Sequence, residues 1–125
     1  MIYNENKEYR LKFYKNSKTN KSLVSEYIDK LKNKDKSKIL KYIEFLRENK
    51  GYLDEPYSKH IKGKIRELRI DFSPNRYRFL YFIFIKKTIV ILSVFSKKTK
   101  KTPMSEIKKA ENNYIDVLNN PQIYE

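Results

Sequence analysis

The sequence contains no cysteine, which excludes disulfide bonds and every metal site that needs a thiolate ligand. Its single histidine, His60, leaves no Cys-His catalytic pair and no zinc cluster of histidines and cysteines. Its two glycines, Gly51 and Gly63, are too few for a glycine-rich loop that cradles phosphates. We therefore predict no cofactor and no metal ion, and we interpret His60 as an ordinary loop residue.

Long apolar runs are also missing. The longest uninterrupted run, residues 79–85, is far shorter than the ~20 residues that cross a bilayer. The N-terminal segment is polar and has no apolar core of a signal peptide. At 125 residues the chain has room for one domain, residues 1–125. We therefore expect a single-domain cytoplasmic protein that has no membrane partner.

Positive charge is abundant. The chain has 29 lysines and arginines against 15 aspartates and glutamates, a formal net charge of +14. Such an excess favours an anionic partner, namely nucleic acid, an acidic protein or an anionic membrane surface. The alternative is that lysine, asparagine, isoleucine and tyrosine are frequent because the genome is rich in A and T. The net charge alone leaves both interpretations open.

Three consecutive runs have the composition of β-strands. Residues 65–70 alternate, with apolar side chains on one face and Glu67 and Arg69 on the other. Residues 77–85 and 88–95 are aromatic and β-branched on both faces, which is typical of central strands covered by helices on both sides. Turns are predicted at residues 73–75 and 86–87.

Two amphipathic helices precede these strands. The first can be capped by Asn20 or Ser22; the second begins with Asp35 as its N-cap, after a link at residues 33–34, and stops at Gly51. Their apolar stripes are Leu23, Val24, Tyr27, Ile28 and Leu31 in the first, and Ile39, Leu40, Ile43 and Leu46 in the second.

The remaining segments complete the predicted fold. Residues 9–14 alternate as an edge strand does, and residues 52–62 have no clear period and are predicted to be a loop. Thr102 followed by Pro103 marks the start of a last helix, which ends at residues 119–121. The apolar stripe of this helix is Ile107, Ala110, Tyr114 and Leu118.

The predicted class is α+β, in the order β-α-α-β-β-β-α. We expect an antiparallel-rich sheet, with the helical hairpin on one face and the last helix at the edge of the sheet.

The densest cations lie in the strand region. Neighbouring antiparallel strands are expected to bring Arg69, Arg78 and Lys98 close together, an arrangement that favours a bound anion. The lysine run precedes the positive N-terminus of the last helix, where phosphate is favoured. The alternative for the lysines is a solvated basic turn. The whole group is Arg66, Arg69, Arg76, Arg78, Lys97, Lys98, Lys100 and Lys101.

Arg78 interrupts an apolar strand, so its guanidinium must find a carboxylate, a phosphate or an exposed position. Glu67 shares a strand face with Arg69 and is a possible partner for either arginine. If Glu67 pairs with Arg78, the arginine has a structural role and its catalytic interpretation weakens.

Several motifs resemble a known family when they are taken in this order: IRELR at residues 65–69, RYRFLY at 76–81, VILSVFSKKT at 90–99 and KTP at 101–103. Together with Glu106, Ile107 and Ala110, they resemble the HigB-like, phage-derived Gp49-like branch of the RelE/ParE toxin superfamily. The motifs cover roughly residues 63–111.

The resemblance implies a RelE-like single domain and a type II toxin: a ribosome-dependent endoribonuclease that cleaves translated mRNA and inhibits translation. It implies a cognate helix-turn-helix antitoxin (HigA-like), with operator DNA contacted only through that antitoxin. The tyrosine or histidine that some relatives use near the C-terminus is not matched by Tyr114 or Tyr124. The implied catalytic residues are Arg69, Arg78, Lys97 and Lys98, with Glu67 as a carboxylate alternative; Arg66, Arg76, Lys100 and Lys101 would bind RNA phosphates.

The reaction would be attack of a ribose 2′-hydroxyl on its own 3′-phosphate, whose transition state gains negative charge that arginines stabilise. Lys97 or Lys98, crowded by other cations, would have a lowered pKa and serve as the base. Two alternatives stay open at this point: a ParE-like toxin that poisons gyrase, and a non-catalytic nucleic-acid-binding module.

Overall fold

A computed structural model describes residues 8–72, 74–85, 87–98 and 100–125. The predicted turns at residues 73–75 and 86–87 include Ser73 and Lys86, which lie outside the described residues. The elements are β1 (Arg10–Phe13), α1 (Leu23–Asp29), α2 (Asn33–Glu48), β2 (Ser58–Lys62), β3 (Ile65–Phe72), β4 (Asn75–Phe84), β5 (Thr88–Ser96), α3 (Met104–Asn119) and the short 3-10 helix η2 (Pro121–Ile123).

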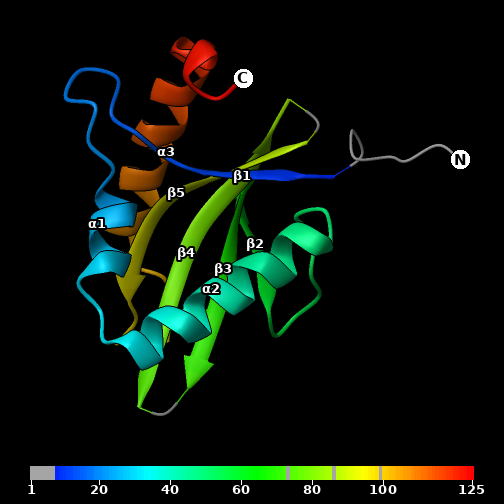
Figure 1. Ribbon diagram of the computed structural model, residues 1–125, viewed down its shortest axis with the longest axis vertical. Helices are drawn as coiled ribbons and strands as arrows, with labels where there is room; N and C mark the ends of the chain where they lie inside the picture. Colours follow the sequence, from blue (N-terminus) through cyan, green and yellow to red (C-terminus); the bar gives the residue numbers. More distant parts are fainter. Residues whose placement is uncertain (1–7, 73, 86, 99) are drawn as a thin grey trace, which may run out of the picture.

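The strands form one mixed sheet in the order β1-β5-β4-β3-β2 (Figure 1). The four strands from β2 to β5 pair antiparallel, and β1 pairs parallel to β5. The α+β class and the antiparallel-rich sheet are therefore confirmed. No helix among the described residues is long and apolar enough to cross a bilayer.

Strand β2 corrects the sequence-based prediction, which placed a loop at residues 52–62. This segment lies at the edge of the sheet, and its side chains at Lys59 and Lys62 are exposed. An edge strand needs a hydrogen-bonding neighbour rather than an alternating apolar pattern, and lysine is common there. Its one buried side chain, Ser58, shares a hydrogen bond of 2.9 Å with the Tyr81 hydroxyl.

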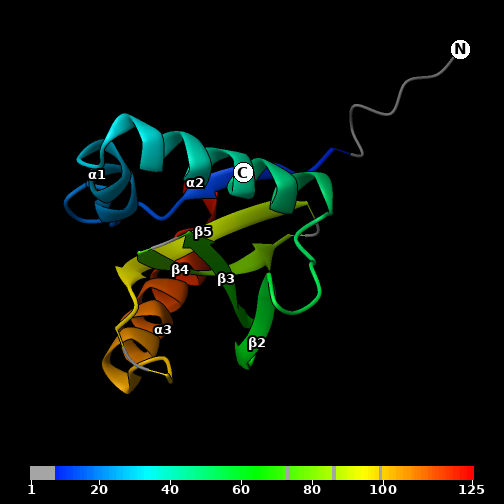
Figure 2. The ribbon, with the colours of Figure 1, turned by 90° about the horizontal axis from the view of Figure 1, so that it is seen from below.

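The sheet lies between two helical layers, as Figure 2 shows. α1 and α2 cover one face, where Ile39, Ile43 and Leu46 pack with apolar side chains of β3, β4 and β5. α3 covers the other face, where Ala110 and Val117 join a second apolar cluster. Central strands buried on both faces are confirmed. The prediction that the last helix lies at the edge is wrong, because β4 and β5 carry apolar side chains on both faces and each face needs a cover.

Helix boundaries differ from the prediction at one end of α2. The helix begins at Asn33, so the predicted link at residues 33–34 is helical and Asp35 is not the cap. The Asp35 carboxylate instead accepts hydrogen bonds from Asn75 Nδ2 (2.9 Å) and the Tyr77 hydroxyl (2.7 Å). These contacts tie the start of α2 to β4.

The predicted ends of α1 and α2 at Ser22 and Gly51 are confirmed, whereas some predicted apolar contacts of the helices are not. Ser22 caps α1 by accepting a hydrogen bond from the Ser25 backbone N–H, and Gly51 follows α2 with φ +82°. A Cβ at Gly51 would lie 2.7 Å from Ile83 Cδ1, so glycine is required there. Three leucines predicted to be apolar contacts of the helices are largely exposed instead: Leu23, Leu40 and Leu118.

Candidate active site

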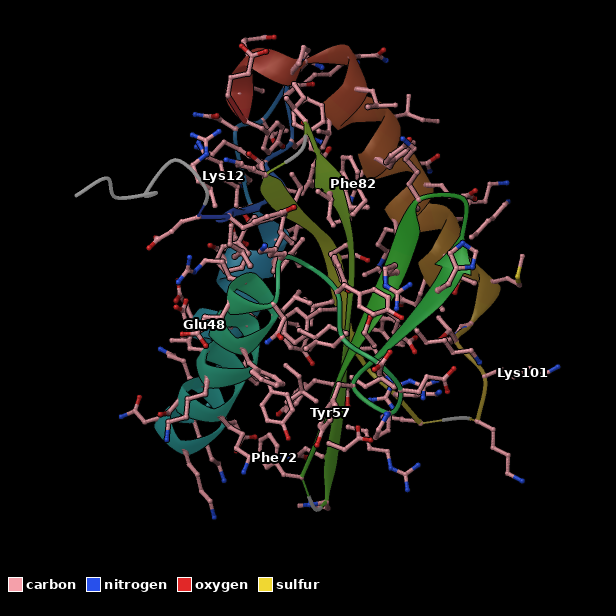
Figure 3. The ribbon with its side chains drawn as sticks, turned by 90° about the vertical axis from the view of Figure 1, so that its right-hand side faces the viewer. Lys12, Glu48, Tyr57, Phe72, Phe82 and Lys101 are labelled. Carbon is pink, nitrogen blue, oxygen red and sulfur yellow. The ribbon has the colours of Figure 1, made fainter. Side chains whose placement is uncertain are left out.

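The candidate site lies on the face of the sheet that α3 covers, next to the start of that helix. Side chains alternate along a strand, so Glu67, Arg69 and Asp71 of β3 share this face. In the register of β3 and β4, Arg69 lies opposite Arg78. Figure 3 shows side-chain nitrogen and oxygen atoms gathered over this part of the sheet, between the labelled Tyr57 and Lys101.

Glu67 forms the floor of the site. Its side chain is 0% exposed, and its Oε1 accepts a hydrogen bond from Arg69 Nε at 3.1 Å. The Thr102 hydroxyl donates to the other carboxylate oxygen, Oε2, and Arg78 Nε lies 3.9 Å from Oε1. A buried carboxylate is tolerated only when it is paired in this way. Glu67 therefore contacts both arginines and the residue before α3, and holds them in place.

Arg78 and Arg69 differ in what they offer to a ligand. Arg78 is buried: its Nη1 donates to Asp71 Oδ1 at 2.5 Å and to the Tyr77 carbonyl oxygen at 3.0 Å, and its side chain is only 6% exposed. The Arg69 side chain is 21% exposed, and among the described residues only one of its guanidinium nitrogens, Nε, has a hydrogen-bond partner. The guanidinium of Arg69 is therefore the accessible one, while Arg78 balances the two carboxylates beneath it.

Lys97 completes the group. It follows β5, where its backbone N–H donates to the Arg76 carbonyl oxygen at 2.7 Å, and its side chain is half-buried. Burial lowers the pKa of Lys97; Arg78 and Arg69 lower it further, while Glu67 opposes them. A lowered lysine pKa was expected from crowding by cations, but desolvation is the larger cause. Lys98 is exposed, and no contact ties it to Glu67.

The other predicted cations lie apart from this group. Arg66 is on the opposite face of β3, because residues of opposite parity point to opposite sides of a strand. There its guanidinium stacks on Tyr52 at 4.9 Å and donates to Ser58 Oγ at 3.2 Å. Arg76 is exposed on β4, and Lys100 is exposed in the segment before α3. Lys101, labelled in Figure 3, is exposed in the same segment.

Three residues of the site were not predicted. Thr102 was expected to cap the last helix, but Pro103 holds that position and the Thr102 hydroxyl is used on Glu67. Asp71 could have been found, because it continues the alternation of Glu67 and Arg69 on one strand face. Lys59 of β2 lies opposite Glu67 of β3. It could not be assigned to the site from the sequence, because β2 was predicted to be a loop.

The arrangement fits phosphate binding without a metal-ligand cluster. Within the described ranges, no group of three or more histidine, cysteine, aspartate and glutamate side chains is placed to hold a metal ion. Two partly exposed cations, Arg69 and Lys97, lie beside the buried carboxylate of Glu67. Tyr124 is buried at the far end of α3, where its hydroxyl bonds with Lys15, so it takes no part in this site.

Comparison with known proteins identifies the family of the chain. Residues 26–115 match the model of a family described as "Phage derived protein Gp49-like (DUF891)". The match covers α2 and β2 to β5 completely, α1 and α3 in part, and all of the candidate site residues. No curated protein matches the sequence significantly. The chain therefore belongs to the phage-derived Gp49-like family, which is part of the RelE/ParE-like superfamily of toxins from toxin–antitoxin systems.

Proposed function

We propose that the chain is the toxin of a type II toxin–antitoxin system and acts as a ribosome-dependent endoribonuclease that cleaves translated mRNA. Family membership supports a toxin of such a system. The observation that carries the nuclease proposal is the pairing of an accessible guanidinium, Arg69, with a lysine of lowered pKa, Lys97, around the buried Glu67. These two groups supply the anion binding and the proton acceptor that RNA cleavage requires.

In the proposed reaction, the 2′-hydroxyl oxygen attacks the adjacent phosphorus while the bond to the 5′-oxygen breaks. The proton of the 2′-hydroxyl moves to neutral Lys97 Nζ, and the leaving 5′-oxygen takes a proton from water. The products are a 2′,3′-cyclic phosphate and a 5′-hydroxyl. The Nη groups of Arg69 donate to the nonbridging oxygens, whose negative charge grows in the transition state.

Glu67 and Arg78 have positioning roles in this proposal. From the sequence, Glu67 was considered as an alternative base and Arg78 as a cation that stabilises the transition state. Glu67 is fully buried and is occupied by Arg69 and Thr102, so substrate does not reach it. Its bond to Arg69 Nε orients the guanidinium toward the open side of the site. Arg78 supplies a buried positive charge 3.9 Å from Glu67.

The proposal includes the partners and the compartment. The ribosome would align the mRNA for in-line attack, which is worth several kcal/mol when few catalytic groups are present. Arg76, Lys98, Lys100 and Lys101 would bind RNA phosphates around the site. A cognate helix-turn-helix antitoxin (HigA-like) would neutralise the toxin in the cytoplasm, and operator DNA would be contacted only through this antitoxin.

The test uses purified chain and translating ribosomes, with mRNA cuts mapped by primer extension. Arg69→Ala should lower the cleavage rate about 100-fold to 1,000-fold, because one donor to a developing oxyanion is lost. Its co-sedimentation with ribosomes should be nearly unchanged. The matched control is Arg76→Ala, an exposed arginine on the neighbouring strand, which should retain cleavage within about tenfold.

Two other outcomes would replace the proposal. Intact mRNA together with accumulated gyrase–DNA breaks would identify a ParE-like gyrase poison. If cleavage by Arg69→Ala fell only in proportion to ribosome binding, the arginine would position RNA and the protein would be a binding module.

A further inference from the structure

Strand β5 has an edge that its neighbour covers only in part. The pairing with β1 spans residues 88–91 and ends where the Tyr14 backbone N–H donates to the Ile91 carbonyl oxygen at 2.8 Å. Beyond this point the chain leaves the sheet toward α1. No described strand pairs with residues 92–96 on this side. An open strand edge is a template for pairing with another extended chain.

A groove follows this open edge. It encloses about 570 Å³ and lies between α1, on one face of the sheet, and α3, on the other face. Figure 2 shows these two helices on opposite sides of the sheet near this edge. We call it the β5-edge groove; its principal lining residues are Leu23, Val24 and Tyr27 of α1, Ser93 of β5, and Lys109 and Asn113 of α3.

A buried polar atom points to a missing partner in the groove. Ser93 is 4% exposed, and among the described residues its Oγ has no hydrogen-bond partner. The neighbouring Leu92 carbonyl oxygen has a substitute for a strand partner, because Asn113 Nδ2 donates to it at 2.9 Å. Buried hydroxyl groups are nearly always hydrogen-bonded in folded proteins. The Ser93 hydroxyl is therefore a polar position in the groove that an additional chain segment would satisfy.

The two walls of the groove differ in chemistry. The α1 wall is apolar and includes Leu23, which is 70% exposed although it is a large aliphatic residue. The α3 wall carries Lys109, whose side chain is 57% exposed and forms a long ion pair of 3.7 Å with Glu106. Around the rim, three lysines (Lys21, Lys30 and Lys109) face a single carboxylate, Glu26. A ligand with carboxylates on one side and apolar groups on the other complements these walls.

We propose that the β5-edge groove binds an extended, acidic segment of a partner protein, which adds a strand to β5 at residues 92–96. Successive side chains of a strand point in opposite directions, so one set packs on Leu23, Val24 and Tyr27 while the other reaches Lys109 and Asn113. The partner segment therefore alternates apolar and carboxylate side chains. This surface is separate from the Arg69 site, and the proposal holds whether or not the chain cleaves RNA.

Two other occupants fit less well. A second copy of the chain would bring the same lysine-rich rim against itself, and like charges repel. Single-stranded RNA would find cations but would leave the exposed backbone groups of β5 and the aliphatic wall without complementary partners.

The test is a titration of the isotope-labelled full chain, followed by NMR, with the seven-residue probe acetyl-Glu-Val-Glu-Val-Glu-Val-Glu-amide. Saturable shifts of the backbone amides of residues 92–95 and of Val24 and Asn113 are expected. Lys109→Glu should weaken binding about fivefold, the upper range for one surface ion pair. The control Lys108→Glu changes the same charge on the adjacent, outward-facing position of α3 and should leave the affinity within about twofold.

The design separates this surface from non-specific charge attraction. A second probe with lysine in place of each glutamate should cause no shifts in the groove. The proposal is overturned if the acidic probe shifts only residues around Arg69, if it shifts none, or if both lysine variants weaken it equally. It is also overturned if an eight-nucleotide oligouridine saturates the same amides, because the groove would then be an RNA site.

Discussion

At the scale of single residues, Arg69 and Arg78 have different tasks although the sequence presents them as equivalent. They lie opposite each other on neighbouring strands, but Arg78 is buried against two carboxylates and Arg69 reaches solvent. Removing one member of a buried ion pair leaves an uncompensated charge, which costs far more than loss of an exposed contact. Burial thus separates a structural arginine from a catalytic candidate.

Arg78→Ala is expected to lower the free energy of unfolding by about 3 kcal/mol, because Glu67 then keeps a buried charge without its second cation. Arg69→Ala should cost less, about 1 kcal/mol, since its side chain is 21% exposed and Arg78 remains beside Glu67. Urea denaturation followed by circular dichroism measures both. The double variant Arg78→Met with Glu67→Gln should recover part of the loss, and equal costs for the two single arginine variants would contradict this assignment.

Lys97 makes cleavage depend on pH in a defined direction. Its pKa lies below the ordinary value of 10.5 because burial disfavours its charge. The cleavage rate should rise with pH as Lys97 loses its proton, and level off below that value. Lys97→Arg keeps the charge but removes the titration, so the rise and most of the activity should disappear, whereas Lys98→Arg should preserve both. The measurement is the single-turnover cleavage rate as a function of pH, over a pH range in which the ribosomes stay intact.

The free energy of unfolding should also depend on whether Lys97 carries a proton, and the direction of this dependence can be tested. The unfolded chain holds the Lys97 proton more tightly than the folded chain does, because the folded pKa is lowered. The free energy of unfolding therefore gains from this group as pH rises through the folded pKa toward 10.5. Lys97→Gln should remove that gain, and an unchanged pH slope in this variant would argue against a buried Lys97 ammonium.

At the scale of elements, a side-chain hydrogen bond attaches the start of α3 to the site. Thr102 precedes the helix and donates its hydroxyl to Glu67 on β3, across the face of the sheet. This bond joins the lysine segment before α3 to the strand that carries Arg69. The geometry of the site therefore depends on how α3 is docked, and residues far apart in the sequence act together.

Thr102→Val keeps the shape of the side chain but removes the donor, which leaves Glu67 Oε2 without a partner. We expect the free energy of unfolding to fall by about 1 to 3 kcal/mol, the usual cost of an unsatisfied buried group. The cleavage rate should fall more than ribosome affinity does, because Arg69 is no longer held by a fixed Glu67. Thr102→Ser retains the hydroxyl and should recover both quantities; failure of this rescue would assign the loss to packing.

At the scale of the whole molecule, the net charge is +14. The charged side chains form two groups, the ion-paired ones that shape the site and the exposed ones that attract RNA. The buried ion pairs set the geometry of the site, whereas exposed lysines attract RNA over a longer range. Lys100 and Lys101 are two of these exposed lysines, in the segment before α3. Figure 3 labels Lys101.

Replacing Lys100 and Lys101 by glutamine should weaken ribosome binding and flatten its dependence on salt. The slope of log affinity against log salt should fall by about 0.7 to 0.9 for each phosphate contact that is lost. The cleavage rate of bound ribosomes should change little. Replacing Lys18 and Lys50, exposed lysines in other parts of the chain, removes the same charge and should have less effect on binding; equal effects would show that only net charge matters.

Much of the fold follows from the sequence, because local patterns encode local structure. The period-2 and continuous apolar runs predicted β3, β4 and β5, and the 3.6-residue stripes predicted all three helices. Burial of β4 and β5 on both faces followed from their composition alone. The motifs around Arg69, Arg78 and Lys97 also identified the family and the face of the sheet to inspect.

The tertiary structure alone decided features that depend on contacts between distant residues. Strand β2 forms because β3 offers it an edge, although its own side chains carry no strand pattern. Glu67 meets Thr102, 35 positions later in the chain, only because α3 docks over the sheet rather than beside it. The burial that lowers the pKa of Lys97 likewise depends on the packing of the folded chain around it. Local periodicity determines which face of a strand a side chain takes, whereas register and docking determine which charges meet on that face. For this reason the sequence drew attention to Glu67, Arg69, Arg78 and Lys97 but did not predict their contacts.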